Sequence, residues 1–282
     1  MKYILLILTL QFAVAVEAQK KGELVEIADH FSFTEGPVAD ARGDIYFTDQ
    51  PNNRIWKYSA SGELIRFLEP SGRANGLAMD NDGWLVACAD ENNEIWRIHP
   101  ETREIEVLVG TYAGKPLNGP NDLWISSSGN YYITDPYYQR SYWSRTSAEL
   151  PEALYMYQQG KLLQVDSNFV RPNGIAASPD ERKLYVADIG DNKTYVYDIA
   201  ENGALHNKRL FCDRGSDGMT TDKKGNVYLT GDGVFVYTPQ GALLRHIKVP
   251  VKWTANVCFG GKESEYLFIT ASEKIFKIYP DW

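Results

Sequence analysis

The stretch that decides the fold is residues 173–188, NGIAASPDERKLYVAD. It contains a polar first residue, a short apolar strand, a Pro-Asp turn and a second strand of alternating apolar residues that ends in Asp. The phrase recurs, and its first position, here called the opener, is always Glu, Asn or Asp: Glu35, Asn75, Asn121, Asn173, Asp217 and, in a degenerate copy, Asn256. Successive openers are 40, 46, 52, 44 and 39 residues apart. This period predicts a β-propeller with one four-stranded blade per copy.

Each copy predicts four strands, but one fourth strand is missing. Turns such as Asn81-Asp82-Gly83 suit a tight hairpin before the second strand. The sixth copy ends with its third strand, 274–278, shortly before Trp282. The strand-like segment 23–27 would complete that blade, and pairing of the two chain ends would remove open sheet edges. The prediction is an all-β, six-bladed propeller, closed by its terminal strands, as a single domain over residues 19–282.

The N-terminus has a different composition from the rest of the chain. Met1-Lys2 is followed by an apolar run, Tyr3 to Val16, and then by small residues up to Ala18. This pattern predicts a secretory signal peptide over residues 1–18, and hence a periplasmic or secreted protein. The run is shorter than the roughly 20 residues of a membrane-spanning helix, so we expect no membrane association of the mature form.

Composition excludes some classes of function. The net charge is -8 and no Lys/Arg cluster occurs, which argues against a nucleic-acid partner. The three cysteines have unrelated spacings, so no disulfide framework is expected. Cys88 and Cys258 lie in apolar strand-like runs, where we expect buried thiols. Nothing in the sequence indicates whether the chain self-associates.

One segment interrupts the repeat. Residues 136–151 separate the second and third strands of the third copy, where other copies use few residues. Because strands of a blade alternate in direction, this loop returns to the face on which the openers lie. A loop of this length is typical of a lid or a binding loop, with an extra packing flap as the alternative. We expect its aromatic residues to line a substrate pocket: Tyr137, Tyr138, Tyr142 and Trp143.

The openers predict a metal site. Glu35 and Asp217 would repel each other in a narrow channel, and their burial is costly unless a cation neutralises both. All-oxygen ligands from several blades suit Ca²⁺ best, with Mg²⁺, Mn²⁺ and Zn²⁺ as alternatives. No His or Cys is an opener, which disfavours zinc. The alternative interpretation treats each Asn-Gly or Asp-Gly pair as an ordinary turn.

Several runs then show a family resemblance: Glu35-Gly36-Pro37, Gly72-Arg73-Ala74-Asn75-Gly76-Leu77, Leu117-Asn118-Gly119-Pro120-Asn121-Asp122, Arg171-Pro172-Asn173-Gly174-Ile175 and Ser216-Asp217-Gly218-Met219. In order and spacing they resemble the gluconolactonase branch of the family that also contains senescence marker protein and the luciferin-regenerating enzyme. The resemblance implies one catalytic divalent cation held by Glu35, Asn121, Asn173 and Asp217. Asn75 and Asn256 would then lie on the substrate side or behind the ligands, and Asn121 would also position substrate. Some animal members carry an Arg where this chain has Gly119, and Arg73 is a candidate replacement.

These observations lead to one main hypothesis and three alternatives. The main hypothesis is a metal-dependent hydrolase of a sugar lactone such as glucono-1,5-lactone, with Asp217 as general base and Glu35 as the alternative base. The second is a phosphotriesterase or arylesterase with the same metal. The third is a non-enzymatic secreted binding propeller with a structural calcium, and the fourth is a repeat scaffold without metal.

Overall fold

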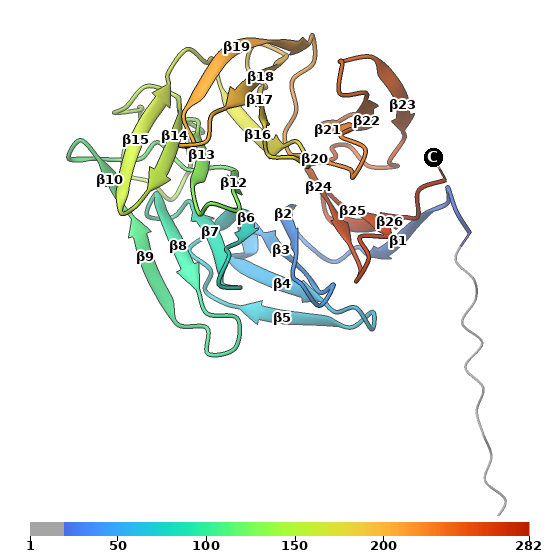
Figure 1. Cartoon of the computed structure of the whole chain (residues 1–282). Helices are drawn as coiled ribbons and strands as arrows, with labels where there is room; N and C mark the ends of the chain where they lie inside the picture. Colours follow the sequence, from blue (N-terminus) through green and yellow to red (C-terminus); the bar gives the residue numbers. More distant parts are fainter. Residues whose placement is uncertain (1–19, 282) are drawn as a thin grey trace, which may run out of the picture.

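Alternating apolar and polar residues in each copy form four antiparallel strands, and six such sheets surround a common axis (Figure 1). The structure is a computed structural model, and it describes residues 20–281. It confirms the predicted six-bladed, all-β propeller. The expected signal peptide, residues 1–18, lies outside the described residues. No helix within residues 20–281 has the length and apolarity needed to cross a bilayer.

The first three blades are each built from consecutive strands. Blade 1 contains β2 (Thr34–Ala39), β3 (Ile45–Asp49), β4 (Arg54–Tyr58) and β5 (Leu64–Leu68). Blade 2 contains β6 (Ala74–Met79), β7 (Leu85–Ala89), β8 (Glu94–Ile98) and β9 (Ile105–Val109). Blade 3 contains β12 (Leu123–Ile125), β13 (Tyr131–Asp135), β14 (Ala153–Gln158) and β15 (Lys161–Asp166).

The last three blades follow the same order, and the sixth takes its outer strand from the N-terminus. Blade 4 contains β16 (Pro172–Ala177), β17 (Lys183–Asp188), β18 (Lys193–Ile199) and β19 (Leu205–Cys212). Blade 5 contains β20 (Met219–Thr221), β21 (Val227–Gly231), β22 (Gly233–Tyr237) and β23 (Leu243–Ile247). Blade 6 contains β24 (Asn256–Gly260), β25 (Tyr266–Ala271), β26 (Lys274–Ile278) and β1 (Leu24–Ala28).

The two ends of the chain close the ring. β1 pairs antiparallel with β26, with Leu24 opposite Ile278, and the blue and red strands lie side by side in Figure 1. The completing strand was predicted at 23–27 and is found one residue later. The closure confirms the expected pairing and leaves neither terminal blade with an unpaired strand.

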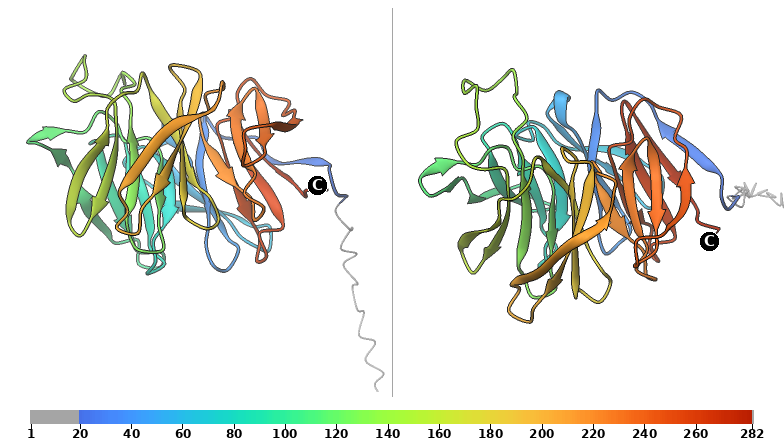
Figure 2. Two further views of the ribbon diagram at one scale, coloured as in Figure 1. Left: turned by 45° about the horizontal axis from the view of Figure 1, so that its top comes forward. Right: turned by 90° about the horizontal axis from the view of Figure 1, so that it is seen from above.

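Two short elements before the third blade are additions to the repeated pattern of strands. A short hairpin, β10 (Thr111–Tyr112) and β11 (Lys115–Pro116), connects blades 2 and 3, and a 3-10 turn, η1 (Gln50–Asn52), follows β3. Neither was predicted. Residues 136–151 form the expected insertion between β13 and β14, without strands of their own. In Figure 2 a yellow-green loop in this part of the chain projects from one face of the ring.

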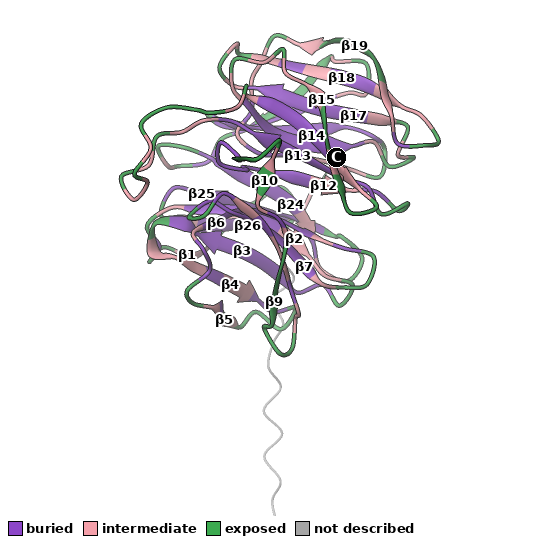
Figure 3. Cartoon of the chain, turned by 90° about the vertical axis from the view of Figure 1, so that its left-hand side faces the viewer, coloured by how far each residue is buried: buried purple, intermediate pink, exposed green. Residues whose placement is uncertain are grey.

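The core lies between neighbouring blades. Tyr46, Tyr132, Tyr185 and Tyr228 occupy corresponding places in the second strands, and each is almost fully buried against the next blade. Burying a large apolar side chain contributes roughly 1.5–3 kcal/mol, so these contacts hold the ring together. Cys88 and Cys258 are buried free thiols, as expected. Figure 3 shows burial concentrated on the inner strands, with exposed outer edges.

Candidate metal centre

Glycines bring the openers close together around the axis. The N–H of Gly76 donates to the carbonyl of Asn121 over 2.7 Å, and a Cβ added at Gly76 would lie 2.6 Å from that oxygen. A Cβ at Gly174 would lie 2.7 Å from the carbonyl oxygen of Asp217. These glycines therefore allow one blade to contact the next opener, so the interpretation of Asn-Gly as a hairpin turn does not apply here.

Buried threonines of the second strands fix the main chain of the next opener. Thr48 Oγ1 donates to the carbonyl of Asn75 over 3.0 Å, and Thr134 Oγ1 donates to the carbonyl of Asn173 over 2.7 Å. Both hydroxyl groups lie in positions that repeat between blades, one residue before the Asp that ends the second strand. The fold thus sets the position of the opener side chains.

Five of the six openers share one pocket of about 520 Å³. Glu35, Asn75, Asn121, Asn173 and Asp217 contribute to its wall. The remaining wall residues come from loops at the same end of the axis: Phe33, Gln50, Pro51, Tyr138, Arg140, Ile189 and Trp253. The two carboxylates, which are 182 positions apart in sequence, therefore face the same space.

The sixth opener takes the second of its two predicted places, behind the ligands, so its assignment as a substrate contact is corrected. Asn256 lies outside this pocket, and its Nδ2 donates to Glu35 Oε2 over 3.2 Å and to Asp122 Oδ2 over 3.3 Å. Asn256 is the first residue of β24 and lines a separate hollow together with Asp122. Asn256 therefore positions Glu35 instead of facing a substrate.

The electrostatics of the pocket are unfavourable for two free carboxylates. Burial, and then the charge of Asp217, raise the pKa of Glu35 well above its usual range. Burial also raises the pKa of Asp217 to about 6, although hydrogen bonds from Trp253 Nε1 (2.6 Å) and Asn173 Nδ2 (2.9 Å) act in the opposite direction. A cation between these groups would remove the mutual repulsion.

The amide groups provide the test of whether the pocket suits a metal. Oδ1 of Asn75 and Oδ1 of Asn173 are buried and have no hydrogen-bond partner within residues 20–281. The Nδ2 of Asn173 is already used by Tyr138 Oη (3.0 Å) and Asp217, which leaves its oxygen for another ligand. Buried acceptors are rarely left unsatisfied, and amide plus carboxylate oxygens are the donors that hard cations prefer.

The donor set also bears on which metal fits. Residues 20–281 contain no group of three or more His, Cys, Asp and Glu side chains that could hold a metal ion. The pocket instead combines the carboxylates of Glu35 and Asp217 with amides. This composition fits Ca²⁺ or Mg²⁺ and provides none of the nitrogen or sulfur ligands typical of zinc.

The insertion 136–151 lies over the openers as expected, but with different residues facing them. Tyr138 and Arg140 line the pocket, whereas Tyr137 and Trp143 do not. Trp143 Nε1 donates to the carbonyl of Asp90 over 2.9 Å, and the rings of Tyr137 and Trp143 lie 6.0 Å apart. The predicted substrate contacts of Tyr137 and Trp143 are therefore corrected, because both rings pack within the insertion.

Arg73 also lies outside the pocket. Its Nη1 donates to the carbonyl of Pro51 over 3.0 Å, and its guanidinium stacks 4.4 Å from the centre of the Tyr142 ring. Arg140 is the arginine that reaches the pocket, and no spacing in the sequence predicts this. Trp253 was also missed. The feature of the sequence that could have indicated Trp253 is its position, three residues before the degenerate opener Asn256.

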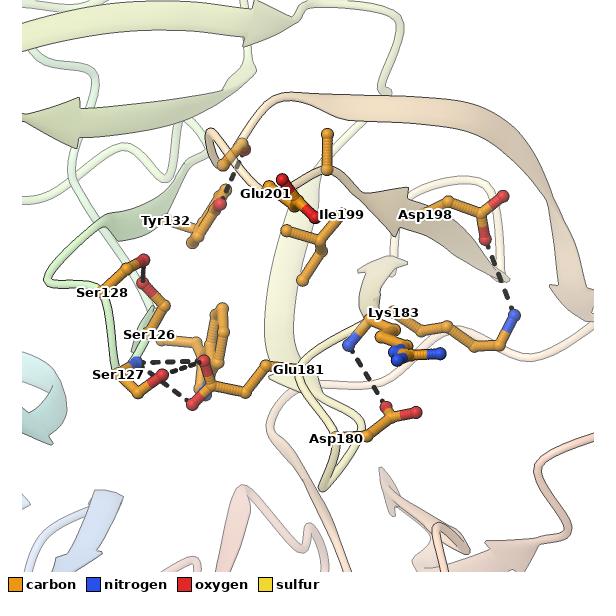
Figure 4. A pocket seen from close by; sticks show the side chains of 14 residues that line it. Ser126, Ser127, Ser128, Tyr132, Asp180, Glu181, Lys183, Asp198, Ile199 and Glu201 are labelled. Atoms are coloured by element: carbon orange, nitrogen blue, oxygen red, sulfur yellow. Dashed lines mark hydrogen bonds and ion pairs between the residues drawn. The ribbon is translucent and has the colours of Figure 1, made fainter.

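A larger hollow of about 840 Å³ lies at the opposite end of the propeller, between blades 3 and 4 (Figure 4). Three of its acidic groups, those of Asp180, Glu181 and Asp198, already have partners. Glu181 accepts hydrogen bonds from the backbone and hydroxyl of Ser127, and Asp198 pairs with Arg209 over 2.7 Å. None of the buried unpaired side-chain oxygens within residues 20–281 belongs to its lining. The groups suited to a metal are those at the openers.

Comparison with known proteins agrees with this geometry. The region described as SMP-30/Gluconolactonase/LRE-like matches residues 33–273. The chain belongs to this family. It is 32% identical to a gluconolactonase of Zymomonas mobilis, over 89% of this chain and 80% of that protein. It is 25% identical to the diisopropyl-fluorophosphatase of Loligo vulgaris, over 88% of each chain.

A solved structure is similar over most of the family member's length. The protein XC5397 from Xanthomonas campestris, described as a gluconolactonase, superposes with a TM-score of 0.85. It is 29% identical to this chain and covers 92% of it, and 90% of that protein is matched. The common architecture therefore extends across the whole propeller.

Proposed function

We propose that this protein is a divalent-metal-dependent lactonase that opens a sugar lactone of the gluconolactone type. The observation that carries the proposal is the pair of buried carboxylates, Glu35 and Asp217, facing one pocket beside unpaired amide oxygens. Glu35, Asn121, Asn173 and Asp217 would hold the cation, and Ca²⁺ fits their chemistry best. When bound, the cation supplies a Lewis acid for the lactone carbonyl and its developing oxyanion.

Asp217 is the residue we assign as general base. In the metal-free protein burial raises its pKa to about 6, and a bound cation would lower that pKa, so the carboxylate is ionised at neutral pH and able to accept a proton. Trp253 and Asn173 hold its two oxygens in place. Water oxygen bonds to the carbonyl carbon while Asp217 takes a water proton, and the ring C–O bond then breaks with proton transfer to the leaving oxygen. Glu35 is held more deeply by Gly36 and Asn256, which suits a ligand better than a base.

The rim of the pocket favours a polyol substrate over a phosphotriester. Gln50, Tyr138 and Arg140 offer hydrogen-bonding groups on one side, and Phe33 and Trp253 offer aromatic surface for the C–H faces of a sugar ring. An apolar sleeve without such donors would suit organophosphates better. A phosphotriesterase or arylesterase activity is therefore the second candidate, and a non-enzymatic propeller with a structural calcium is the third.

The proposal includes export of the protein to the periplasm or the exterior. Its basis is the N-terminal sequence, with a basic start, an apolar run and small residues before Gln19. Extracellular compartments hold enough calcium to occupy weak oxygen-ligand sites. N-terminal sequencing of the mature protein tests this point, and a mature chain that retains residues 1–18 would contradict it.

The activity is tested with a panel of substrates and metals. Glucono-1,5-lactone, a homoserine lactone and a phosphotriester are each assayed with Ca²⁺, Mg²⁺, Mn²⁺, Zn²⁺ or a chelator. We expect the aldonolactone to be hydrolysed fastest and the chelator to abolish turnover. The Asp217→Asn variant should lose activity, whereas the exposed-site control Asp232→Asn should not. Turnover that is insensitive to the chelator would refute the metal-dependent mechanism.

A further inference from the structure

A second hollow adjoins the metal pocket. It measures about 550 Å³ and shares Gln50, Pro51 and Arg140 with that pocket, so the two form one continuous groove. Its lining has two guanidinium groups and no carboxylate: Gln50, Pro51, Arg73, Gln139, Arg140, Ser141 and Tyr142. A groove with this lining presents two guanidinium groups, whose shape and charge suit an oxyanion.

Only one nitrogen of the Arg140 guanidinium is engaged in a hydrogen bond within residues 20–281. Its Nε donates to Asp90 Oδ2 over 2.8 Å, and its terminal nitrogens have no hydrogen-bond partner within residues 20–281. Asp90 has only 3% of its side chain exposed and also accepts hydrogen bonds from Tyr142 Oη and from Gln50 Nε2 (3.2 Å). The planar guanidinium is therefore oriented by a buried network while its outer edge faces the groove, an arrangement suited to an oxyanion.

The role of Asp90 departs from that of its counterparts in other blades. Asp49, Asp135 and Asp188 each accept hydrogen bonds from backbone N–H groups just before the opener of their own blade. In blade 2 the side chain of Asn53 takes over this function, accepting from the N–H of Arg73 over 2.7 Å. Asp90 is thereby available to hold the insertion, and the placement of Arg140 is a built feature of this chain.

Arg73 provides the second positive group. Its guanidinium stacks 4.4 Å from the centre of the Tyr142 ring, and its Nε is buried without a hydrogen-bond partner within the described residues. The nearest carboxylate is that of Glu91, whose Oε1 lies 3.9 Å from this nitrogen and whose side chain is 41% exposed. A long, exposed contact of this kind neutralises little of the charge.

We propose that this groove binds an anionic substituent of the lactone, such as a phosphate, sulfonate or carboxylate that extends from the ring held in the metal pocket. Arg140 and Arg73 are then specificity-determining residues that favour charged over neutral lactones. This inference rests on the proposed lactonase function. The shared chemistry is a terminal oxyanion, which the guanidinium edge of Arg140 can bind with two donors.

The test compares glucono-1,5-lactone with its 6-phosphate. Removing one charge-assisted hydrogen bond should lower kcat/KM of Arg140→Gln about ten- to a hundredfold more for the 6-phosphate than for the neutral lactone, which also meets Arg140 at the rim of the metal pocket. Arg73→Gln should shift the same ratio with less than about a threefold change for the neutral lactone, because Arg73 lies outside the metal pocket and its hydrogen bond goes to Pro51 rather than to Asp90. Arg209→Gln, which removes a positive charge from the outer strand β19, should leave the ratio unchanged. A sulfonate and a carboxylate analogue identify which anion is preferred.

A binding measurement separates this inference from the proposed activity. Calorimetric titration of the wild-type protein should show tighter binding of 6-phosphogluconate than of gluconate, and the difference should disappear in Arg140→Gln. Equal loss on both lactones in Arg140→Gln and Arg73→Gln would overturn the inference and leave the lactonase standing. A wild-type protein that hydrolyses neither lactone but still discriminates between the two acids would refute the activity while retaining the anion site.

Discussion

Replacing Asp217 with Asn should stabilise the metal-free protein. Burial raises the pKa of Asp217 from 3.8 to about 6, so the folded protein binds a proton that the unfolded chain has already released between these pH values. Ionising Asp217 in the folded state therefore costs about 3 kcal/mol of unfolding free energy at pH 8. The cost is absent below about pH 4 and complete above about pH 6 to 7, because the folded pKa lies above the unfolded one.

The substitution has a smaller opposing effect. An Asn side chain retains one acceptor oxygen, so one of the hydrogen bonds from Trp253 and Asn173 is lost, at about 1 kcal/mol. The net gain is about 2 kcal/mol, which corresponds to a Tm increase of about 4–8 °C for a domain of this size. The change also removes a negative charge that raises the pKa of Glu35, which adds to the gain.

The measurement is thermal denaturation of wild type and Asp217→Asn at pH 4 and pH 8. Each protein is measured once with a chelator and once with an excess of calcium, about 5 mM. With chelator, the variant should melt higher at pH 8 and slightly lower at pH 4, where only the loss of the hydrogen bond, about 1 kcal/mol, remains. With calcium, the wild type should gain stability and the variant should not. Asp232→Asn, an exposed carboxylate, serves as control. A chelated variant that melts lower than wild type at pH 8 would refute the reasoning.

Two further substitutions test the packing of the ring and the assignment of the base. Gly76→Ala places a Cβ 2.6 Å from the carbonyl oxygen of Asn121 and should lower the unfolding free energy by about 1–3 kcal/mol in urea denaturation. Gly110→Ala, where the nearest atom is 3.8 Å away, is its control, and equal effects would contradict the close-packing argument. Trp253→Phe removes a 2.6 Å hydrogen bond to Asp217, so the pKa of the base should rise and the acid limb of the kcat/KM profile should move up by about one pH unit. An unchanged acid limb would show that Asp217 is not the base.

The propeller could be predicted because every blade repeats the same local pattern. The predicted strand 274–278 agrees with β26, and the strand predicted at 23–27 is found as β1 one residue later. The hairpin of β10 and β11 was missed because residues 111–116 have no counterpart in the other copies. The missing outer strand could be assigned to the N-terminus because a closed ring leaves no other place for it.

The meeting of the openers in one pocket could be predicted for the same reason, whereas the rim of the pocket could not. Glu35 and Asp217 lie at repeated positions, so blade symmetry brings them together. Arg140 and Trp253 lie in segments outside the repeat, and their directions depend on tertiary contacts such as the pairing of Arg140 with Asp90. The sequence left open whether Asn256 lies on the substrate side or behind the ligands, and only the tertiary structure shows its side chain turned toward Glu35.

The central claim is that Glu35 and Asp217 coordinate one divalent cation together with Asn121 and Asn173. The most direct measurement is an anomalous difference map from crystals of the full chain soaked in calcium or manganese. The account predicts one strong peak in the pocket, within about 2.0–2.6 Å of oxygens from both carboxylates. A fully soaked crystal with an empty pocket, or with the ion bound by only one of the two carboxylates, would contradict it.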